Sequence, residues 1–180
     1  IDVSFTVKPG LQGNYTVGKK YIGNNNNFAT VAELNEALFL KGLSGSIVVE
    51  FTDDVYDVNS LFLDHPAWDL SSAILGLGYD KNTDSYRTIT FKPSADKAAS
   101  YGSILFNLYA SNGVGVKFGT SSTNLNPYAI INQPLEAEKK ATYFDNGGYI
   151  TFDGGPQKSF KFIVHSDNPK HASVFYLDRG

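Results

Sequence analysis

The segments Arg87-Thr88-Ile89-Thr90-Phe91 and Gly148-Tyr149-Ile150-Thr151-Phe152 share the core Ile-Thr-Phe and stand 61 residues apart. Both have the composition of β-strands, and both run into a turn-forming stretch. If the chain winds as a solenoid of roughly 20–30 residues per coil, this spacing equals two or three coils. Chance recurrence of three common strand residues also explains the repeated Ile-Thr-Phe. A β-sandwich likewise consists of short strands. These residues alone leave both folds open.

The rest of the sequence favours β-structure around one helix, because Phe, Tyr and β-branched residues are frequent and Gly, Asn and Asp supply turns. Thr30 and Glu33 form a capping box and Gly42 suits a helix end, which predicts a helix over 31–41. Strands are predicted at 47–51, 88–91, 104–108, 114–118, 128–131, 149–152, 160–164 and 174–177. The irregular stretch between Asp53 and Asp84 predicts a longer loop, which includes 64–69.

Composition excludes several classes of protein. The chain has 180 residues, a net charge of −3 and no Cys. Its 15 Lys and Arg residues are spread thinly along the sequence, whereas a nucleic-acid-binding protein has clustered basic residues. No apolar run reaches the roughly 18 residues that a membrane helix needs. Without Cys, the chain has no disulfide, no thiol nucleophile and no Cys-ligated zinc.

Several motifs occur in a characteristic order, and each motif is short. They are Leu11-Gln12-Gly13-Asn14-Tyr15-Thr16-Val17-Gly18, then Asn27-Phe28-Ala29-Thr30-Val31-Ala32-Glu33, then Gly42-Leu43-Ser44-Gly45-Ser46-Ile47, Tyr56 and the two Ile-Thr-Phe strands. Over about residues 11–155 this order resembles the N-terminal part of the right-handed parallel β-helix surface proteins that bacteria export through type IX secretion systems. Ser46 stands where that family often has Pro, and Asn35 interrupts the usual run before Ala37.

The resemblance implies an all-β fold, a right-handed parallel β-helix, with the β-sandwich as the alternative. Residues 1–45 would form an N-terminal cap containing the helix, and residues 46–180 the first coils of a β-helix that continues in a longer protein. Ile89 and Ile150 should then face one core in parallel strands of one sheet, as should Phe91 and Phe152. Val31, Leu34 and Leu38 should be buried against the first coil.

The family also implies a function and a location. We expect a non-catalytic, secreted or cell-surface module of a bacterial adhesin-like protein, acting as a rigid scaffold with carbohydrate binding as a further role. Its expected partners are a polysaccharide or surface glycan and the type IX secretion machinery, with no nucleic acid and no membrane span. The alternative is the N-terminal part of a polysaccharide lyase or glycoside hydrolase whose active site lies in later coils.

Two groups of acidic residues have the types that glycosidase catalysis needs. Asn82-Thr83-Asp84 matches one motif of pectin-hydrolysing glycosidases, and Asp53-Asp54 could supply a second carboxylate pair. That family places its Asp pair after the Asn-Thr-Asp motif and also needs Gly-His-Gly and Arg-Ile-Lys, which this sequence lacks. We therefore expect no catalytic residue in this chain.

No metal ligand or cofactor is predicted either. The His165 and His171 spacing, with Asp167 between them, fits neither a helix face nor a strand face and predicts a surface loop. Asp53, Asp54 and Asp57 could bind calcium but have the pattern of a solvated turn.

Four aromatic residues in loop-like stretches are the candidate ligand-binding residues: Trp68, Tyr79, Tyr86 and Tyr101. Exposed aromatic rings can stack on sugar rings through their flat apolar faces. For Trp68 the competing interpretation is that it fills the core.

Overall fold

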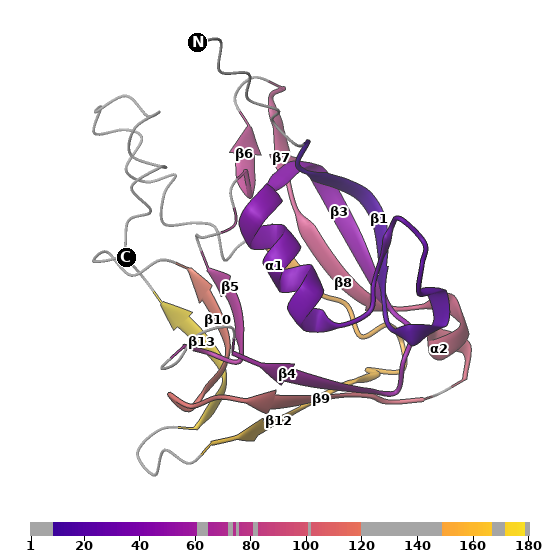
Figure 1. Ribbon diagram of the computed structural model, residues 1–180, viewed down its shortest axis with the longest axis vertical. Coiled ribbons are helices and arrows are strands. Elements are labelled where there is room, and N and C mark those ends of the chain that lie inside the picture. Colours follow the sequence, from indigo (N-terminus) through magenta and orange to yellow (C-terminus); the bar gives the residue numbers. More distant parts are fainter. Residues whose placement is uncertain are drawn as a thin grey trace, which may run out of the picture.

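The computed structural model describes residues 9–60, 65–71, 74, 76–80, 83–100, 102–119, 149–166 and 172–178 (Figure 1). Its elements, in chain order, are β1 (Leu11–Val17), η1 (Lys19–Tyr21), β2 (Asn27–Phe28), α1 (Val31–Lys41), β3 (Leu43–Phe51), β4 (Val55–Asn59), β5 (Trp68–Ser71), β6 (Gly78–Asp80), β7 (Ser85–Arg87), β8 (Ile89–Pro93), α2 (Ala95–Ala99), β9 (Ile104–Tyr109), β10 (Val114–Gly119), β11 (Ile150–Phe152), β12 (Phe160–His165) and β13 (Ser173–Asp178). Within these ranges the helices are too short and too polar to cross a membrane.

Three parallel sheets enclose the core and lie as the sides of a triangle (Figure 1). Each sheet takes one strand from each of three passes of the chain, which are β3-β4-β5, β8-β9-β10 and β11-β12-β13. Strands β1 and β2 extend the largest sheet beyond β3, in the order β11-β8-β3-β1-β2. Strands β6 and β7 form a separate antiparallel hairpin. The fold is all-β, and the parallel pairing of its three larger sheets argues against a β-sandwich, whose sheets are antiparallel.

The two Ile-Thr-Phe segments lie in one sheet and run parallel, as predicted. Ile150 pairs with Ile89, and Phe152 pairs with Phe91. Ile89 and Phe91 are fully buried, while Ile150 and Phe152 pack against the same core. The expected separation of two or three short coils is wrong, because β8 and β11 are direct neighbours. One pass takes 42 residues from Ile47 to Ile89 and the next takes 61 to Ile150, since a hairpin and long connections lie between the strands.

Helix α1 has the predicted bounds, and its capping explains both ends. The Thr30 hydroxyl accepts a hydrogen bond from the Glu33 N–H at 3.1 Å, and the Glu33 carboxylate accepts one from the Ala29 N–H at 2.8 Å. Gly42, at φ 63°, ends the helix.

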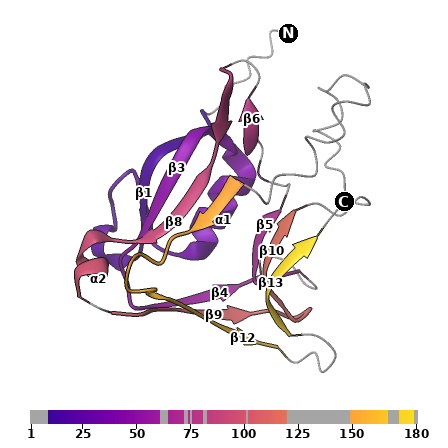
Figure 2. The ribbon, with the colours of Figure 1, turned by 180° about the vertical axis from the view of Figure 1, so that it is seen from behind.

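The apolar face of α1 covers the end of the core that the first pass leaves open. Val31, Leu34 and Leu38 are buried, as predicted. The helix packs against β1, β4 and β5 and lies over the interior of the triangle in Figure 1, whereas in Figure 2 β11 of the third pass lies in front of it. The helix therefore keeps water from the inward side chains of the first pass.

Several strands lie where a loop or a turn was predicted. Strands β4, β5 and β6 fall within the stretch between Asp53 and Asp84, so the long loop predicted there is wrong at these positions. Strand β3 begins at Leu43, four residues earlier than the strand predicted at 47–51. The strand predicted at 128–131 lies outside the described residues.

Inward aromatic rings join neighbouring passes inside the triangle. Tyr56, Phe106 and Phe162 occupy one register position of β4, β9 and β12. Their rings stack, with centroids 5.4 Å apart for the first pair and 5.0 Å for the second. Such ladders of like side chains fix the register of each new strand on the previous one, because a shift of one residue would turn the rings outward.

Candidate functional site

Trp68 is part of the core, so its prediction as a glycan-stacking residue is wrong. It begins β5 and is 0% exposed. Its indole lies 5.1 Å from the Phe91 ring and 5.8 Å from the Phe106 ring, centroid to centroid. A sugar cannot reach a ring that is covered on all sides. The pairing of β5 with β10 turns Trp68 inward. The residues around it, His65-Pro66-Ala67 and Asp69, do not have a pattern that predicts a strand.

Tyr86 is exposed, and the structure brings it together with Tyr149. Tyr86 lies in β7 with 56% of its surface accessible, and Tyr149 directly precedes β11. Their rings stack with centroids 5.2 Å apart and planes 21° from parallel. We call these two residues the tyrosine pair. Sequence reasoning did not select Tyr149, because only the pairing of β11 with β8 brings it near the hairpin.

The other two predicted aromatic residues are Tyr79 and Tyr101. The backbone of Tyr79 pairs with that of Tyr86 across the β6-β7 hairpin. The side chain of Tyr79 and the whole of Tyr101 lie outside the described residues.

Hydrogen bonds to the first pass hold the backbone around Tyr86 in place. The Ser46 hydroxyl donates to the Tyr86 carbonyl oxygen at 3.1 Å and accepts from the Thr88 N–H at 3.0 Å. The Arg87 guanidinium donates to the Leu43 carbonyl oxygen at 3.0 Å and also forms an ion pair with Asp80. The hairpin is therefore tied to the start of β3, so the tyrosine pair sits on an anchored backbone.

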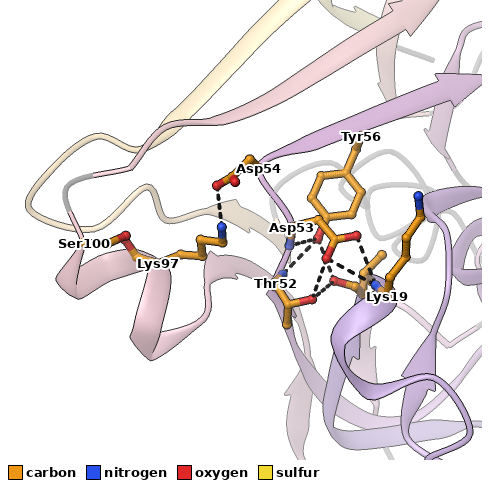
Figure 3. Close-up of polar contacts among 8 residues, drawn as sticks. Lys19, Thr52, Asp53, Asp54, Tyr56, Lys97 and Ser100 are labelled. Atoms are coloured by element: carbon orange, nitrogen blue, oxygen red, sulfur yellow. Dashed lines mark hydrogen bonds and ion pairs between the residues drawn. The ribbon is translucent and has the colours of Figure 1, made fainter.

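A second polar cluster, the corner network, lies where β3 turns into β4 (Figure 3). The Tyr56 hydroxyl accepts from the Thr52 N–H at 2.9 Å and the Asp53 N–H at 2.8 Å, and it donates to the Val17 carbonyl oxygen at 2.7 Å. Burial raises the pKa of Tyr56 to about 12. With its proton held and its oxygen occupied by backbone groups, Tyr56 stabilises the corner.

The two carboxylates of this corner serve different partners. Asp53 accepts from the Lys19 N–H through both carboxylate oxygens, at 3.2 and 3.0 Å. Asp54 forms an ion pair with Lys97 of α2. Figure 3 shows the two side chains turned toward these separate groups. Asp53 thus ties η1 to the corner, and Asp54 ties α2 to it.

These acids also lie far from Asp84. Asp53 and Asp54 follow the end of β3, whereas Asp84 belongs to the β6-β7 hairpin, which is tied to the start of β3 through Arg87. The nine residues of β3 span about 26 Å. Glycosidase carboxylates stand about 5–10 Å apart, so Asp84 cannot act together with Asp53 or Asp54 on one glycosidic bond.

A polar row follows the outer face of β4, β9 and β12. Asn107 donates to the Asp57 carboxylate at 2.9 Å, and its amide oxygen lies 3.3 Å from Nε2 of His165. The His165 ring stacks on Tyr109 with centroids 4.7 Å apart. The predicted turn is wrong at Asp57, which lies in β4. His165 is the last residue of β12, and most of the surface loop predicted between His165 and His171 lies outside the described residues.

The described residues hold no group of three or more His, Cys, Asp or Glu side chains that could bind a metal ion. His171 and Asp167, the other two residues of the His165 segment, lie outside the described ranges. Comparisons with protein families, with curated proteins and with solved structures found no match to this chain.

Proposed function

We propose that this chain is a rigid, non-catalytic module of a secreted or cell-surface adhesin-like protein, built as a right-handed parallel β-helix. The observation that carries the proposal is the repeated parallel register, in which each strand of one pass pairs with its equivalent in the next. Such stacking gives a stiff body whose outer faces can present side chains at fixed spacings. The motif resemblance supports the extracellular location and export by type IX secretion machinery.

The module contacts a glycan through the tyrosine pair. Tyr86 presents an exposed, flat, partly apolar ring, and the ring of Tyr149, the residue before β11, stacks against it. A ring held in this way loses little conformational freedom when a sugar stacks on it. The anchored backbone of β7 further limits the movement of Tyr86.

Binding to an array of neutral and acidic oligosaccharides tests this contact. Tyr86→Ala should weaken binding to the captured sugars by about tenfold, equivalent to about 1.4 kcal/mol. Tyr86→Phe should bind like the native chain, because the ring carries the contact. Tyr109→Ala is the matched control, since Tyr109 is 41% exposed and lies on a different sheet.

Two outcomes would contradict the glycan contact. One is a native chain that captures no oligosaccharide. The other is a Tyr86→Ala variant that binds as well as the Tyr109→Ala control. A hydrolysed or eliminated sugar product, detected on the same array by mass spectrometry, would contradict the non-catalytic assignment.

A further inference from the structure

The outer face of the largest sheet carries a group of threonines. Ile89 and Phe91 of β8 are buried. Because side chains alternate along a strand, Thr88 and Thr90 lie on the opposite face, which points away from the core. Thr151 of β11 is exposed on the same face, directly beside Thr90 in the register. We call Thr88, Thr90 and Thr151 the threonine group. The passes stack within the plane of the sheet, as β3, β8 and β11 show in Figure 2, so stacking does not cover this face.

The hydroxyls of the threonine group make no hydrogen bond to another residue in the described ranges. The other threonines of those ranges differ, because the hydroxyl of each has a partner within the protein; they are Thr16, Thr30, Thr52 and Thr83. A hydroxyl both donates and accepts hydrogen bonds. The outer face of this sheet therefore gathers the threonine hydroxyls that are available to a ligand.

The threonine group borders the tyrosine pair. Thr88 lies beside Tyr149, since the residues that follow them are register partners. Tyr86 stands two residues before Thr88 on the same segment, where β7 leads into β8, and its ring stacks on that of Tyr149. The aromatic rings and the hydroxyls thus form one continuous surface along β7 and β8, which we call the strip.

The sheet beneath the strip has no unpaired charge. Its five strands contain two charged residues, Glu50 and Lys92, which are register partners in β3 and β8. The Lys92 Nζ lies 3.1 Å from Oε1 of Glu50, so the two charges neutralise each other. A carboxylate or sulfate group on a sugar needs a cationic partner when it leaves water. The strands of this sheet offer none, which favours a neutral sugar.

The length of the strip favours a chain of sugars over a single ring. Tyr86 and Thr90 are four residues apart on an extended segment, so they lie about 13 Å from each other. One ring stacked on Tyr86 cannot reach that far, whereas a linear chain of about three rings along β8 can. Thr151 lies about 4.8 Å from Thr90 across the sheet, so one ring can bond to both hydroxyls.

We propose that the strip binds a neutral, linear oligosaccharide of about three units, with one ring stacked on Tyr86 and another hydrogen-bonded to Thr90 and Thr151. This inference rests on the proposed glycan contact of the tyrosine pair. It adds to that contact the class of sugar, the direction of the sugar chain along β8 and two binding residues.

NMR titration of the whole chain with neutral β-1,4-linked gluco-, manno- and galacto-oligosaccharides of one to four units tests the proposal. At least one series should bind, with a dissociation constant that falls by about tenfold from one unit to three and changes little at four. The uronate trisaccharide of the same linkage should bind about tenfold more weakly. Affinity for the neutral trisaccharide should be the same at about 0.05 and 0.5 M NaCl, because no net charge is involved.

Threonine variants test the two binding residues. Thr90→Val and Thr151→Val keep the shape of the side chain and remove the hydroxyl, so each should weaken binding of the trisaccharide by about threefold to tenfold. Both should leave binding of the monosaccharide unchanged, whereas Tyr86→Ala should weaken both. Asn59→Ala is the control, because Asn59 is exposed on the outer face of β4, in a different sheet. Thermal melts followed by circular dichroism show that each variant is folded.

The outcomes separate this inference from the contact on which it rests. If Tyr86→Ala binds every sugar as the native chain does, the glycan contact itself fails. If Tyr86→Ala loses binding, the contact stands. The inference is then overturned by a trisaccharide that binds no tighter than the monosaccharide, by threonine variants that bind it like the native chain, or by tighter binding of the uronate. Capture of only acidic or branched sugars on the oligosaccharide array, with no binding in the three neutral series, would likewise overturn it.

Discussion

Replacing Leu34 by Ala should destabilise the protein strongly, because α1 closes the core through this residue. Leu34 is 0% exposed and sits at the centre of the buried face of the helix. The change removes three carbon atoms, worth about 0.8 kcal/mol each in transfer free energy, and leaves a cavity that raises the total to about 2–5 kcal/mol. For a chain of this size, that loss corresponds to a melting temperature lower by about 5–15 °C.

Leu40→Ala on the same helix is the matched control. Leu40 is 67% exposed, so its truncation should change the free energy of unfolding by less than about 0.5 kcal/mol. Both substitutions have the same effect on helix propensity, so their difference isolates burial. Urea unfolding followed by circular dichroism measures both variants. Equal stabilities for Leu34→Ala and Leu40→Ala would refute the covering role of α1.

Two further predictions concern the corner network. Burial raises the pKa of Tyr56 from 10.0 to about 12. Between about pH 10 and 12 the native state therefore keeps a proton that the unfolded chain loses. The free energy of unfolding should fall by up to about 3 kcal/mol over this range. Urea titrations of Tyr56→Phe should lack this part of the pH dependence, and an unchanged profile would count against it. Gly18→Ala should destabilise by about 1–3 kcal/mol, because a Cβ at φ 135° would lie 2.1 Å from the Thr52 hydroxyl oxygen. Gly13→Ala, where the same test atom meets open space, should cost less in the same urea assay.

Local signals predicted the elements whose own residues determine their structure. The capping box at Thr30 and Glu33 and the glycine at position 42 defined α1 to the residue. Alternation located β9, β10 and β12 to within one residue at each end. In these segments, the hydrophobic period and the turn residues indicate the same boundaries.

The missed strands depend on neighbours distant in the sequence. Strand β1 contains Gln12, Gly13 and Asn14, and it is held by parallel pairing with β3. Strand β5 begins at Trp68, whose polar and Pro-containing surroundings predicted a loop. Short parallel strands gain stability from the strands beside them, so their own residues give a weak signal.

The candidate site was only partly predictable for the same reason. Tyr86 was selected as an exposed aromatic residue, and it is exposed. Its partner Tyr149 follows from the pairing of β11 with β8, which joins segments 61 residues apart. Register between passes cannot be derived from spacing when the passes differ in length, so neither the tyrosine pair nor the row from Asp57 to His165 was predicted.

The central claim is that the three passes stack in parallel and in register, and isoleucine methyl NMR tests it most directly. Ile47, Ile89 and Ile150 occupy one register position in β3, β8 and β11. In a sample labelled at isoleucine δ1 methyl groups, we predict nuclear Overhauser cross-peaks from Ile89 to both Ile47 and Ile150, and none between Ile47 and Ile150. Absence of the Ile89–Ile150 cross-peak, or a direct Ile47–Ile150 cross-peak, would contradict the stacking order.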